Sequence, residues 1–231
     1  MTLDNALKLL STSSLKFSSL TSWKDPYEKK VIEAKYIINN NKISYPIKGK
    51  FLATCFTEQY SCEAQWKAYS GNKRQPCVEI FFNKEKLLEK LDETGAYSYI
   101  GKVEYCATKV FSQKVSSCFN SNAAKKAFLS KAPMKPNNLK YTLRPIYIKR
   151  LSFAYENEWR LILTNEDIYD NDGIVNIPNL LDCIDGVVIG PCKDQTEYLS
   201  AKKKLENYIP SNHIHESYLR KVGKRKMTIT L

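Results

Sequence analysis

The segment "FAYENEWRLIL", residues 153–163, places two glutamates and an arginine at intervals of two residues. If the segment is a β-strand, Glu156, Glu158 and Arg160 share one face, because side chains of a strand alternate between its faces. Trp159 and Leu161 then point to the other face and into the core. Two close carboxylates repel, so one pKa should rise unless a cation compensates, and Arg160 is the natural compensator. Such a row could do acid–base or cation-stabilising chemistry.

Two other interpretations of these acidic residues stay open. In a helix, Glu156 and Arg160 would form an ordinary pair at spacing four, which stabilises by only about 0.2–0.5 kcal/mol and needs no function. The β-like run "WRLIL" favours the strand. Alternatively, Asp25 and Glu28 of "KDPYE" could join the row as an acidic site for Mg²⁺, although Asp-Pro is more typical of a helix start.

The elements that must position the row alternate irregularly along the chain. The pattern predicts strands in "KFSSL", "GKFLATCFTE", "PCVEIFF", "YIGKVEYCATKVF", "EWRLIL" and "IDGVVIGP". It predicts helices over residues 28–42, 61–71, 83–95, 121–133 and 194–209. We therefore expect one α+β domain over residues 1–231, with a central mixed or antiparallel sheet and flanking helices. Phosphate-binding P-loop and GxGxxG patterns do not occur in the sequence.

Composition restricts the partners and the compartment. The net charge of +12 and the pI of about 9.2 suit an anionic partner such as nucleic acid. Seven cysteines without a CxxC pair, and a start that does not resemble a signal peptide, indicate a reducing cytoplasm. No apolar run is long enough to cross a bilayer, so we expect no membrane partner. Only His213 and His215 are present, which disfavours a histidine-based metal site or catalytic triad.

Three blocks resemble a bacterial family catalogued as domain of unknown function 2971. They are "LKFSSLTSWKDPYE", "TCFTEQYSCEAQWKAYSGNKRQPCVEIFF" and "FAYENEWRLIL", in the order that the family shows. Lys24, Thr57, Gln65 and Phe153 depart from the family pattern. The order of the blocks is also similar to that of ADP-ribosyltransferases, which implies a possible ADP-ribosyltransferase-like fold and NAD as the cofactor, with no metal expected.

The resemblance to ADP-ribosyltransferases implies roles for particular residues. Lys16 would meet the pyrophosphate from a first strand, although Lys lacks the bidentate fork of the Arg used in that family. A second strand would supply Thr54 and Thr57, and a third would supply Glu156 and Glu158. The other candidate cofactor-binding residues are the aromatic Trp66 and Tyr69, which could stack on nicotinamide, and Arg160.

The chemistry implied by this resemblance is cleavage of the nicotinamide–ribose bond, which passes through an oxocarbenium-like cation. Glu158 would stabilise that cation, an effect typically worth roughly 3–4 kcal/mol. Glu156 would orient or deprotonate the acceptor.

The first hypothesis is therefore an NAD-dependent ADP-ribosyltransferase-like enzyme that modifies nucleic acid or protein. Such an enzyme could be a toxin or a phage-defence effector, and its partner would be an antitoxin or a protein target. A metal-dependent nuclease and a non-catalytic nucleic-acid- or protein-binding module with a structural salt-bridge row are the alternatives.

Overall fold

The computed structural model describes residues 1–49, 51–60, 62–70, 76–164 and 173–219. It contains two compact units, each built from separated segments of the chain. The first unit comprises Met1–Ser13, Tyr60–Leu87 and Pro178–Leu231, and the second comprises Ser14–Gln59 and Leu88–Ile177. The single domain over residues 1–231 stays a prediction.

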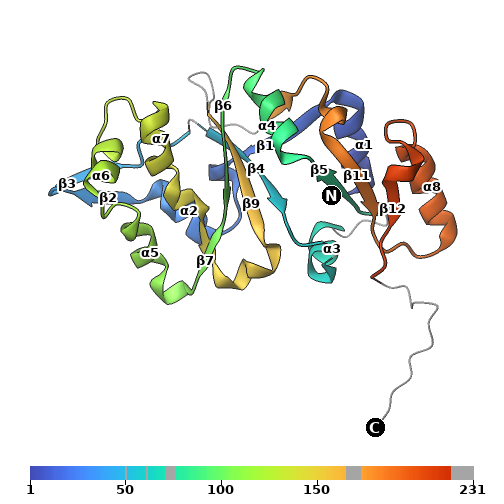
Figure 1. The fold of residues 1–231 in the computed structure, drawn as a ribbon. Coiled ribbons are helices and arrows are strands. Elements are labelled where there is room, and N and C mark those ends of the chain that lie inside the picture. Colours follow the sequence, from blue (N-terminus) through green and yellow to red (C-terminus); the bar gives the residue numbers. More distant parts are fainter. Residues whose placement is uncertain (50, 61, 71–75, 165–172, 220–231) are drawn as a thin grey trace, which may run out of the picture. The chain divides into compact units, whose positions relative to one another are not determined.

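The second unit contains a five-stranded sheet with the order β10-β1-β4-β9-β6 (Figure 1). All neighbouring strands in it are antiparallel. Strand β9 (Glu158–Thr164) lies between β4 (Phe51–Thr57) and β6 (Tyr97–Lys102). The remaining strands are β1 (Ser14–Ser19) and β10 (Gly173–Asn176). Glu158 and Arg160 therefore lie on an inner strand, with hydrogen-bonded neighbours on both sides.

Helices and short strand pairs complete the second unit. The helices are α2 (Pro26–Glu33), α5 (Phe111–Ser117), α6 (Asn122–Phe128) and α7 (Pro136–Thr142). The strand pairs are the hairpin of β2 (Lys35–Ile38) with β3 (Asn41–Ser44), and the parallel pair of β7 (Glu104–Cys106) with β8 (Ile148–Arg150). The 3-10 helices are η1 (Leu20–Ser22), η2 (Thr108–Val110), η3 (Arg144–Tyr147) and η4 (Leu151–Glu156).

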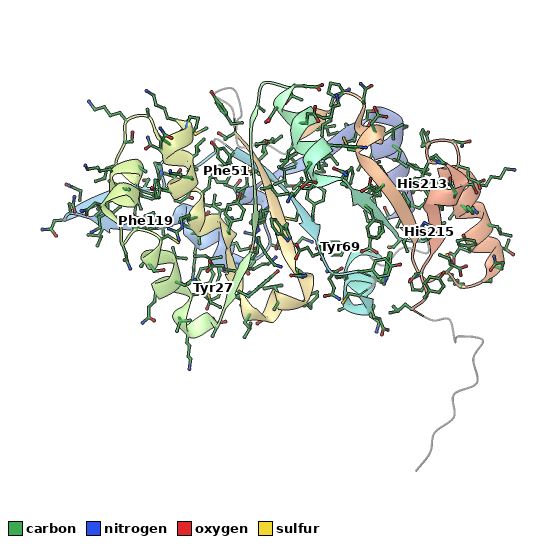
Figure 2. All side chains as sticks on the ribbon, in the orientation of Figure 1. Tyr27, Phe51, Tyr69, Phe119, His213 and His215 are labelled. Atoms are coloured by element: carbon green, nitrogen blue, oxygen red, sulfur yellow. The ribbon has the colours of Figure 1, made fainter. Side chains whose placement is uncertain are left out.

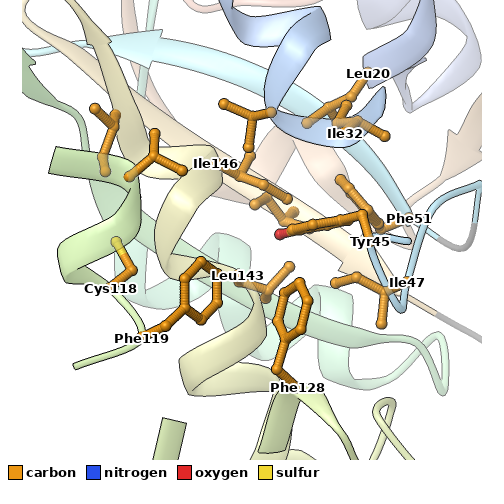
Figure 3. Packing of buried hydrophobic residues seen from close by; sticks show 14 of the residues in the cluster. Leu20, Ile32, Tyr45, Ile47, Phe51, Cys118, Phe119, Phe128, Leu143 and Ile146 are labelled. Atoms are coloured by element: carbon orange, nitrogen blue, oxygen red, sulfur yellow. The ribbon is translucent and has the colours of Figure 1, made fainter. Parts of the chain in front are cut away.

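One hydrophobic cluster joins these helices, the hairpin and the sheet (Figure 3). Ile162 of β9 and Ala53 of β4 contribute to it from the same face of the sheet that carries Arg160. Aromatic rings fill the space between the hairpin and the helices. The ring centre of Tyr36 lies 5.4 Å from that of Phe119 and 4.9 Å from that of Phe128. The charged row consequently lies on the core-facing side of the sheet.

The predicted helix over residues 28–42 is wrong in its second half. Helix α2 ends at Glu33, and residues 35–44 form the β2–β3 hairpin. Asn39 and Asn40 make the turn with φ values of 51° and 62°, a left-handed conformation that Asn tolerates well and that two-residue hairpin turns require. The asparagine run is therefore a turn signal between two short strands.

The first unit contains a three-stranded mixed sheet with the order β12-β11-β5. Its strands are β5 (Val78–Phe82), β11 (Ile184–Ile189) and β12 (Ile214–Glu216), and its helices are α1 (Leu3–Thr12), α3 (Glu63–Ser70) and α8 (Gln195–Leu205). The 3-10 helices η5 (Leu180–Cys183) and η6 (Ser211–His213) also belong to this unit. The boundary between the two units along the chain falls within helix α4 (Lys84–Asp92). His213 ends η6 and His215 lies on β12, and both are labelled in Figure 2.

The predicted α+β class with mixed and antiparallel sheets is confirmed. Within the described residues, no helix combines the length and the apolar character needed to cross a membrane.

Candidate functional site

Strand β9 carries Glu158 and Arg160 of the charged row on one face, as its alternating sequence predicts. In the ladder with β4, Glu158 pairs with Thr57 and Arg160 pairs with Cys55. Directly opposed residues of antiparallel strands point to the same side, so these four side chains share a face. Trp159 and its partners lie on the opposite face. The strand prediction for "EWRLIL" is confirmed.

Glu156 is not part of this strand, which corrects the prediction that the strand starts there. It ends the 3-10 helix η4, and Asn157 follows with a left-handed φ of 40° before β9 begins at Glu158. Strand alternation therefore cannot bring Glu156 and Glu158 together. Lys149 of β8 does so instead, because its Nζ lies 2.6 Å from Glu156 Oε2 and 2.8 Å from Glu158 Oε2.

Arg160 is the centre of the network and is 1% exposed. Its Nε donates to Glu158 Oε1 over 2.8 Å, and its Nη2 donates to Glu158 Oε2 over 3.2 Å. The guanidinium also donates to the carboxylate of Glu28 on α2 and to the carbonyl oxygen of Ile146. Trp23 covers it, with the guanidinium carbon 4.3 Å from the ring centre. Removing one partner of such a buried pair typically costs about 3–5 kcal/mol, because the other charge stays buried.

The two carboxylates that contact Arg160 have pKa values displaced in opposite directions. Burial acts to raise the pKa of Glu158, but the charges and hydrogen bonds of Arg160 and Lys149 outweigh burial and lower it to about 2. For Glu28, burial prevails over the opposing charge of Arg160 and raises the pKa. A pair of carboxyl groups separated in this way is typical of sites that divide acid and base roles, and also of structural ion networks.

The network becomes more exposed along one direction. The exposed fraction of the side chain rises from 1% at Arg160 and 4% at Glu158 to 10% at Lys149 and 15% at Glu156. Thr57 is exposed at this end, and its Oγ1 donates to the carbonyl oxygen of Glu156 over 2.6 Å. A ligand could therefore meet the network at Glu156 and Lys149, whereas Arg160 is closed to solvent.

Cys55 also adjoins this part of the network. The residue as a whole is exposed, yet loss of solvation at its thiol and the negative charge of Glu158 raise its pKa well above the ordinary value. The thiol in turn helps to lower the pKa of Glu158 and so to keep that carboxylate ionised. The backbone N–H of Glu158 donates to the Oη of Tyr105 over 2.9 Å. With its pKa raised, the Cys55 thiol is not an activated nucleophile.

A second ion pair lies on the same side of the sheet. Arg150 of β8 is held by Asp25, with its Nη2 at 2.9 Å from Oδ1 and its Nε at 3.3 Å from Oδ2. The guanidinium lies over the rings of Tyr27 and Phe153, at 4.5 and 5.3 Å from the ring centres. Successive residues of β8, Lys149 and Arg150, thus supply cations to two acidic groups.

The structure places the other predicted site residues at different locations. Lys16 is exposed on β1, next to β4 in the sheet. Thr54 pairs with Leu161 and so lies on the face opposite to Glu158, which separates it from the charged row. Trp66 and Tyr69 belong to α3 of the first unit, so their stacking role stays a prediction. Figure 2 shows Tyr69.

The acidic residues that a magnesium site would need are interleaved with cations. Asp25 is paired with Arg150, Glu28 with Arg160, and Glu156 and Glu158 with Lys149. Among the described residues, no group of three or more His, Cys, Asp or Glu is arranged to hold a metal ion.

Sequence reasoning missed Lys149 as the residue that joins the two glutamates. A weak signal was present, because "KR" at residues 149–150 precedes "ENE" at 156–158 within a short stretch. Trp23 and Tyr105 gave no comparable signal, since their roles depend on contacts between distant segments.

Residues 65–161 match the family model described as "Protein of unknown function (DUF2971)". The predicted resemblance to this family is confirmed over these residues. The DUF2971 match ends at Leu161, so it includes Glu156, Glu158 and Arg160 and most of the block "TCFTEQYSCEAQWKAYSGNKRQPCVEIFF". The description of the family gives no activity. No curated protein and no solved structure matches the chain. The resemblance to ADP-ribosyltransferases is not shown by these comparisons.

Proposed function

We propose that this chain is an ADP-ribosyltransferase-like enzyme that cleaves the bond between nicotinamide and ribose in NAD. One observation carries the proposal: strands β1, β4 and β9, which bear the three blocks implied by the resemblance, are consecutive neighbours in one sheet. Three segments that are distant in sequence thus lie next to one another in one sheet. A role as a toxin or phage-defence effector with an antitoxin would suit this chemistry and belongs to the same proposal.

Glu158 is suited to stabilise developing positive charge. Its pKa of about 2 keeps the carboxylate ionised near neutral pH, and Arg160 and Lys149 hold its oxygens in place. A preorganised charge of this kind needs no rearrangement when the ribose becomes cationic. The bond between C1′ and the nicotinamide nitrogen breaks, and nicotinamide leaves neutral with the electron pair.

Glu156 is suited to act on the acceptor. It lies at the more exposed end of the network, where an acceptor hydroxyl from nucleic acid or protein would approach. The acceptor oxygen then bonds to C1′, and Glu156 takes its proton. Lys16, exposed on β1, is the proposed contact for the pyrophosphate.

The experiment is nicotinamide release from NAD by purified protein, with and without nucleic acid. Glu158→Gln should lower the rate by roughly a hundredfold or more, as loss of a preorganised electrostatic group does. Glu156→Gln should slow transfer to an acceptor and leave release into water less affected. Glu33→Gln, an exposed glutamate of α2, is the matched control and should leave both rates unchanged.

Binding of NAD is measured separately, by thermal unfolding. NAD at a hundred times its dissociation constant should stabilise the fold by about 2.7 kcal/mol, whereas Mg²⁺ should have no effect. No nicotinamide release under any condition, together with unchanged unfolding in NAD, would overturn the proposal. Stabilisation by Mg²⁺ instead would favour the nuclease.

A second candidate is a binding module in which the network has a structural role. The observation that favours it is the complete pairing of Glu158, whose side chain is 4% exposed and bonded to both Arg160 and Lys149. This candidate predicts no NAD chemistry, and unfolding that responds to neither NAD nor Mg²⁺.

A further inference from the structure

Positive charge is concentrated in one part of the second unit. Residues 35–49 and 108–144 contain eleven of the chain's 36 Lys and Arg residues and none of its 24 Asp and Glu residues. These residues form the β2–β3 hairpin and the helices α5, α6 and α7, which we call the basic layer. Since the net charge of the whole chain is +12, the remainder is nearly neutral.

The basic layer packs together as one body. Tyr36 and Tyr45 of the hairpin segment meet the rings of Phe119 and Phe128, and Tyr45 donates a hydrogen bond to the carbonyl oxygen of Thr142. The hairpin and the helices lie side by side at one end of the second unit (Figure 1). Because the apolar side chains face this core, the intervening lysines are left on the outer surface.

The cations of the basic layer face solvent. Lys42 and Lys48 of the hairpin segment are exposed. The exposed cations without a carboxylate partner among the described residues of the helical segment are Lys109, Lys126, Lys131, Lys135, Lys140 and Arg144. Within the described part of the layer, Lys114 is the exception, with its Nζ 2.6 Å from Glu104 of β7.

Other helices of the same chain show a different arrangement. Lysines pair with a glutamate three or four residues away in α2, in α3, at the end of α4 and at the end of α8. Alternating signs of this kind keep a helix soluble without self-repulsion. In the basic layer, unpaired like charges repel each other and disfavour the compact state. Solubility alone therefore does not account for this distribution.

We propose that the basic layer binds the phosphate backbone of nucleic acid. The exposed polar residues on either side of Lys114 in α5 include Ser112, Gln113 and Ser116, which can donate hydrogen bonds to phosphate and sugar oxygens. A helix lying in a membrane surface would need an apolar face toward lipid. The apolar residues of α5, Phe111 and Val115, are buried in the protein core instead. Binding of this type is independent of sequence and is governed by release of counterions.

The inference goes beyond NAD cleavage and does not depend on it, because the basic layer shares no residue with the charged row. Glu158→Gln should therefore bind nucleic acid as the wild type does. Loss of nicotinamide release with intact nucleic-acid binding, or the reverse, would separate the two proposals.

The test measures binding of the full-length protein to a fluorescent 20-nucleotide single strand and to its duplex, between 50 and 300 mM salt. Lys126→Gln with Lys135→Gln should weaken binding about tenfold or more near 0.1 M salt. The slope of log K against log salt should fall by roughly 1.4 for the single strand and roughly 1.8 for the duplex, as expected for two lost phosphate contacts.

Matched variants show whether the location of the charge matters. Lys203→Gln with Lys204→Gln removes two exposed lysines from α8 and should change affinity less than twofold. Lys224→Gln with Lys226→Gln removes two lysines from the basic stretch "RKVGKRKMT", residues 220–228, which lies outside the described residues, and should likewise change affinity less than twofold.

Equal losses in all three double variants would overturn the inference in favour of net charge alone. A loss confined to the variant at residues 224 and 226 would assign binding to that stretch. No binding to either nucleic acid at 50 mM salt would also overturn the inference, and so would preferential binding to vesicles containing 30% phosphatidylserine.

Discussion

Glu28 and Glu158 contact the same guanidinium but differ in what surrounds the rest of each carboxylate. Glu158 also accepts a hydrogen bond from Lys149, and the nearby thiol of Cys55 further lowers its pKa. Among the described hydrogen bonds, the side chain of Glu28 is bonded to Arg160 alone. Cations and hydrogen bonds therefore prevail over burial at Glu158, and burial prevails at Glu28. The two residues should consequently make the stability of the fold depend on pH in opposite ways.

The lowered pKa of Glu158 should make the fold lose stability in acid. Its folded-state value of about 2 lies below the ordinary 4.5, so the contribution is present above pH 4.5 and is lost as the pH falls toward 2. The full effect is at most roughly 3 kcal/mol, because one pKa unit corresponds to about 1.4 kcal/mol. Urea unfolding of wild type and Glu158→Gln between pH 2.5 and 7 measures it, and the variant should show a flatter profile below pH 4.5.

Glu28→Gln provides the opposite comparison. The raised pKa of Glu28 favours protonation in the folded state, so its contribution is present below 4.5 and is lost as the pH rises through the raised value. This variant should flatten the profile above pH 4.5 and leave the acid limb unchanged. If both variants altered the same limb in the same direction, the assignment of opposite shifts would be wrong.

At the scale of elements, the start of helix α2 positions one end of the network. Asp25 is its N-cap, with Oδ1 accepting from the N–H of Tyr27 over 2.9 Å, and Pro26 occupies the first turn. Glu28 follows within that turn and is directed at Arg160. The same Asp25 carboxylate holds Arg150 on β8. The cap therefore fixes the helix start and ties it to the strand that carries Lys149.

Asp25→Ala should destabilise the fold by about 1–3 kcal/mol, because it removes a cap worth about 1 kcal/mol and leaves Arg150 without its partner. Asp25→Asn keeps an oxygen for the cap and loses only the charge, so it should cost about 1 kcal/mol less. Urea midpoints of the two variants and the wild type give the comparison. Equal destabilisation by Ala and Asn would show that the cap contributes nothing beyond the ion pair.

At the scale of the whole molecule, all seven cysteines are free thiols in different environments. Cys77, Cys118 and Cys183 are buried, and Cys62, Cys106 and Cys192 are partly exposed. Burial is the main cause that raises the pKa of the Cys192 thiol to about 11, and the nearby Glu197 adds to it. The thiolate is the reactive form, so such thiols react slowly near neutral pH.

Thiol titration with a disulfide reagent at pH 8 should therefore report the integrity of the whole fold. The buried Cys77, Cys118 and Cys183 should react only after unfolding, so at most four thiols should react in the native protein. Cys192 should react about a hundredfold more slowly than an exposed thiol of ordinary pKa, in proportion to its smaller thiolate fraction. All seven should react in guanidinium chloride without reductant. Fewer than seven would indicate a disulfide, and seven fast thiols in the native protein would contradict the described core.

Local sequence pattern was sufficient for several of these features. The alternation of Glu158, Trp159, Arg160 and Leu161 depends only on the period of an extended strand, so which of these residues share a face followed directly from the sequence. The core was expected on the side of Trp159 and Leu161, whereas Glu158 and Arg160 are buried as well. The α+β class followed in the same way from short apolar strands between amphipathic helices. The residues 35–44 were misassigned because a short β-branched segment beside a helix is ambiguous until its turn residues are considered.

The partners of the charged row were decided by tertiary structure. Glu28 is 132 residues from Arg160 along the chain, and Lys149 reaches two carboxylates from a different strand. Thr54 was expected beside Glu158, but the register between β4 and β9 turns it to the other face and places Cys55 and Thr57 there instead. The register between strands and the pairing of distant segments are set by the packing of the whole core. The local periodicity of the sequence does not determine them. The sequence therefore predicted which residues are charged and how they alternate, whereas the fold decided which charges meet and how deeply they are buried.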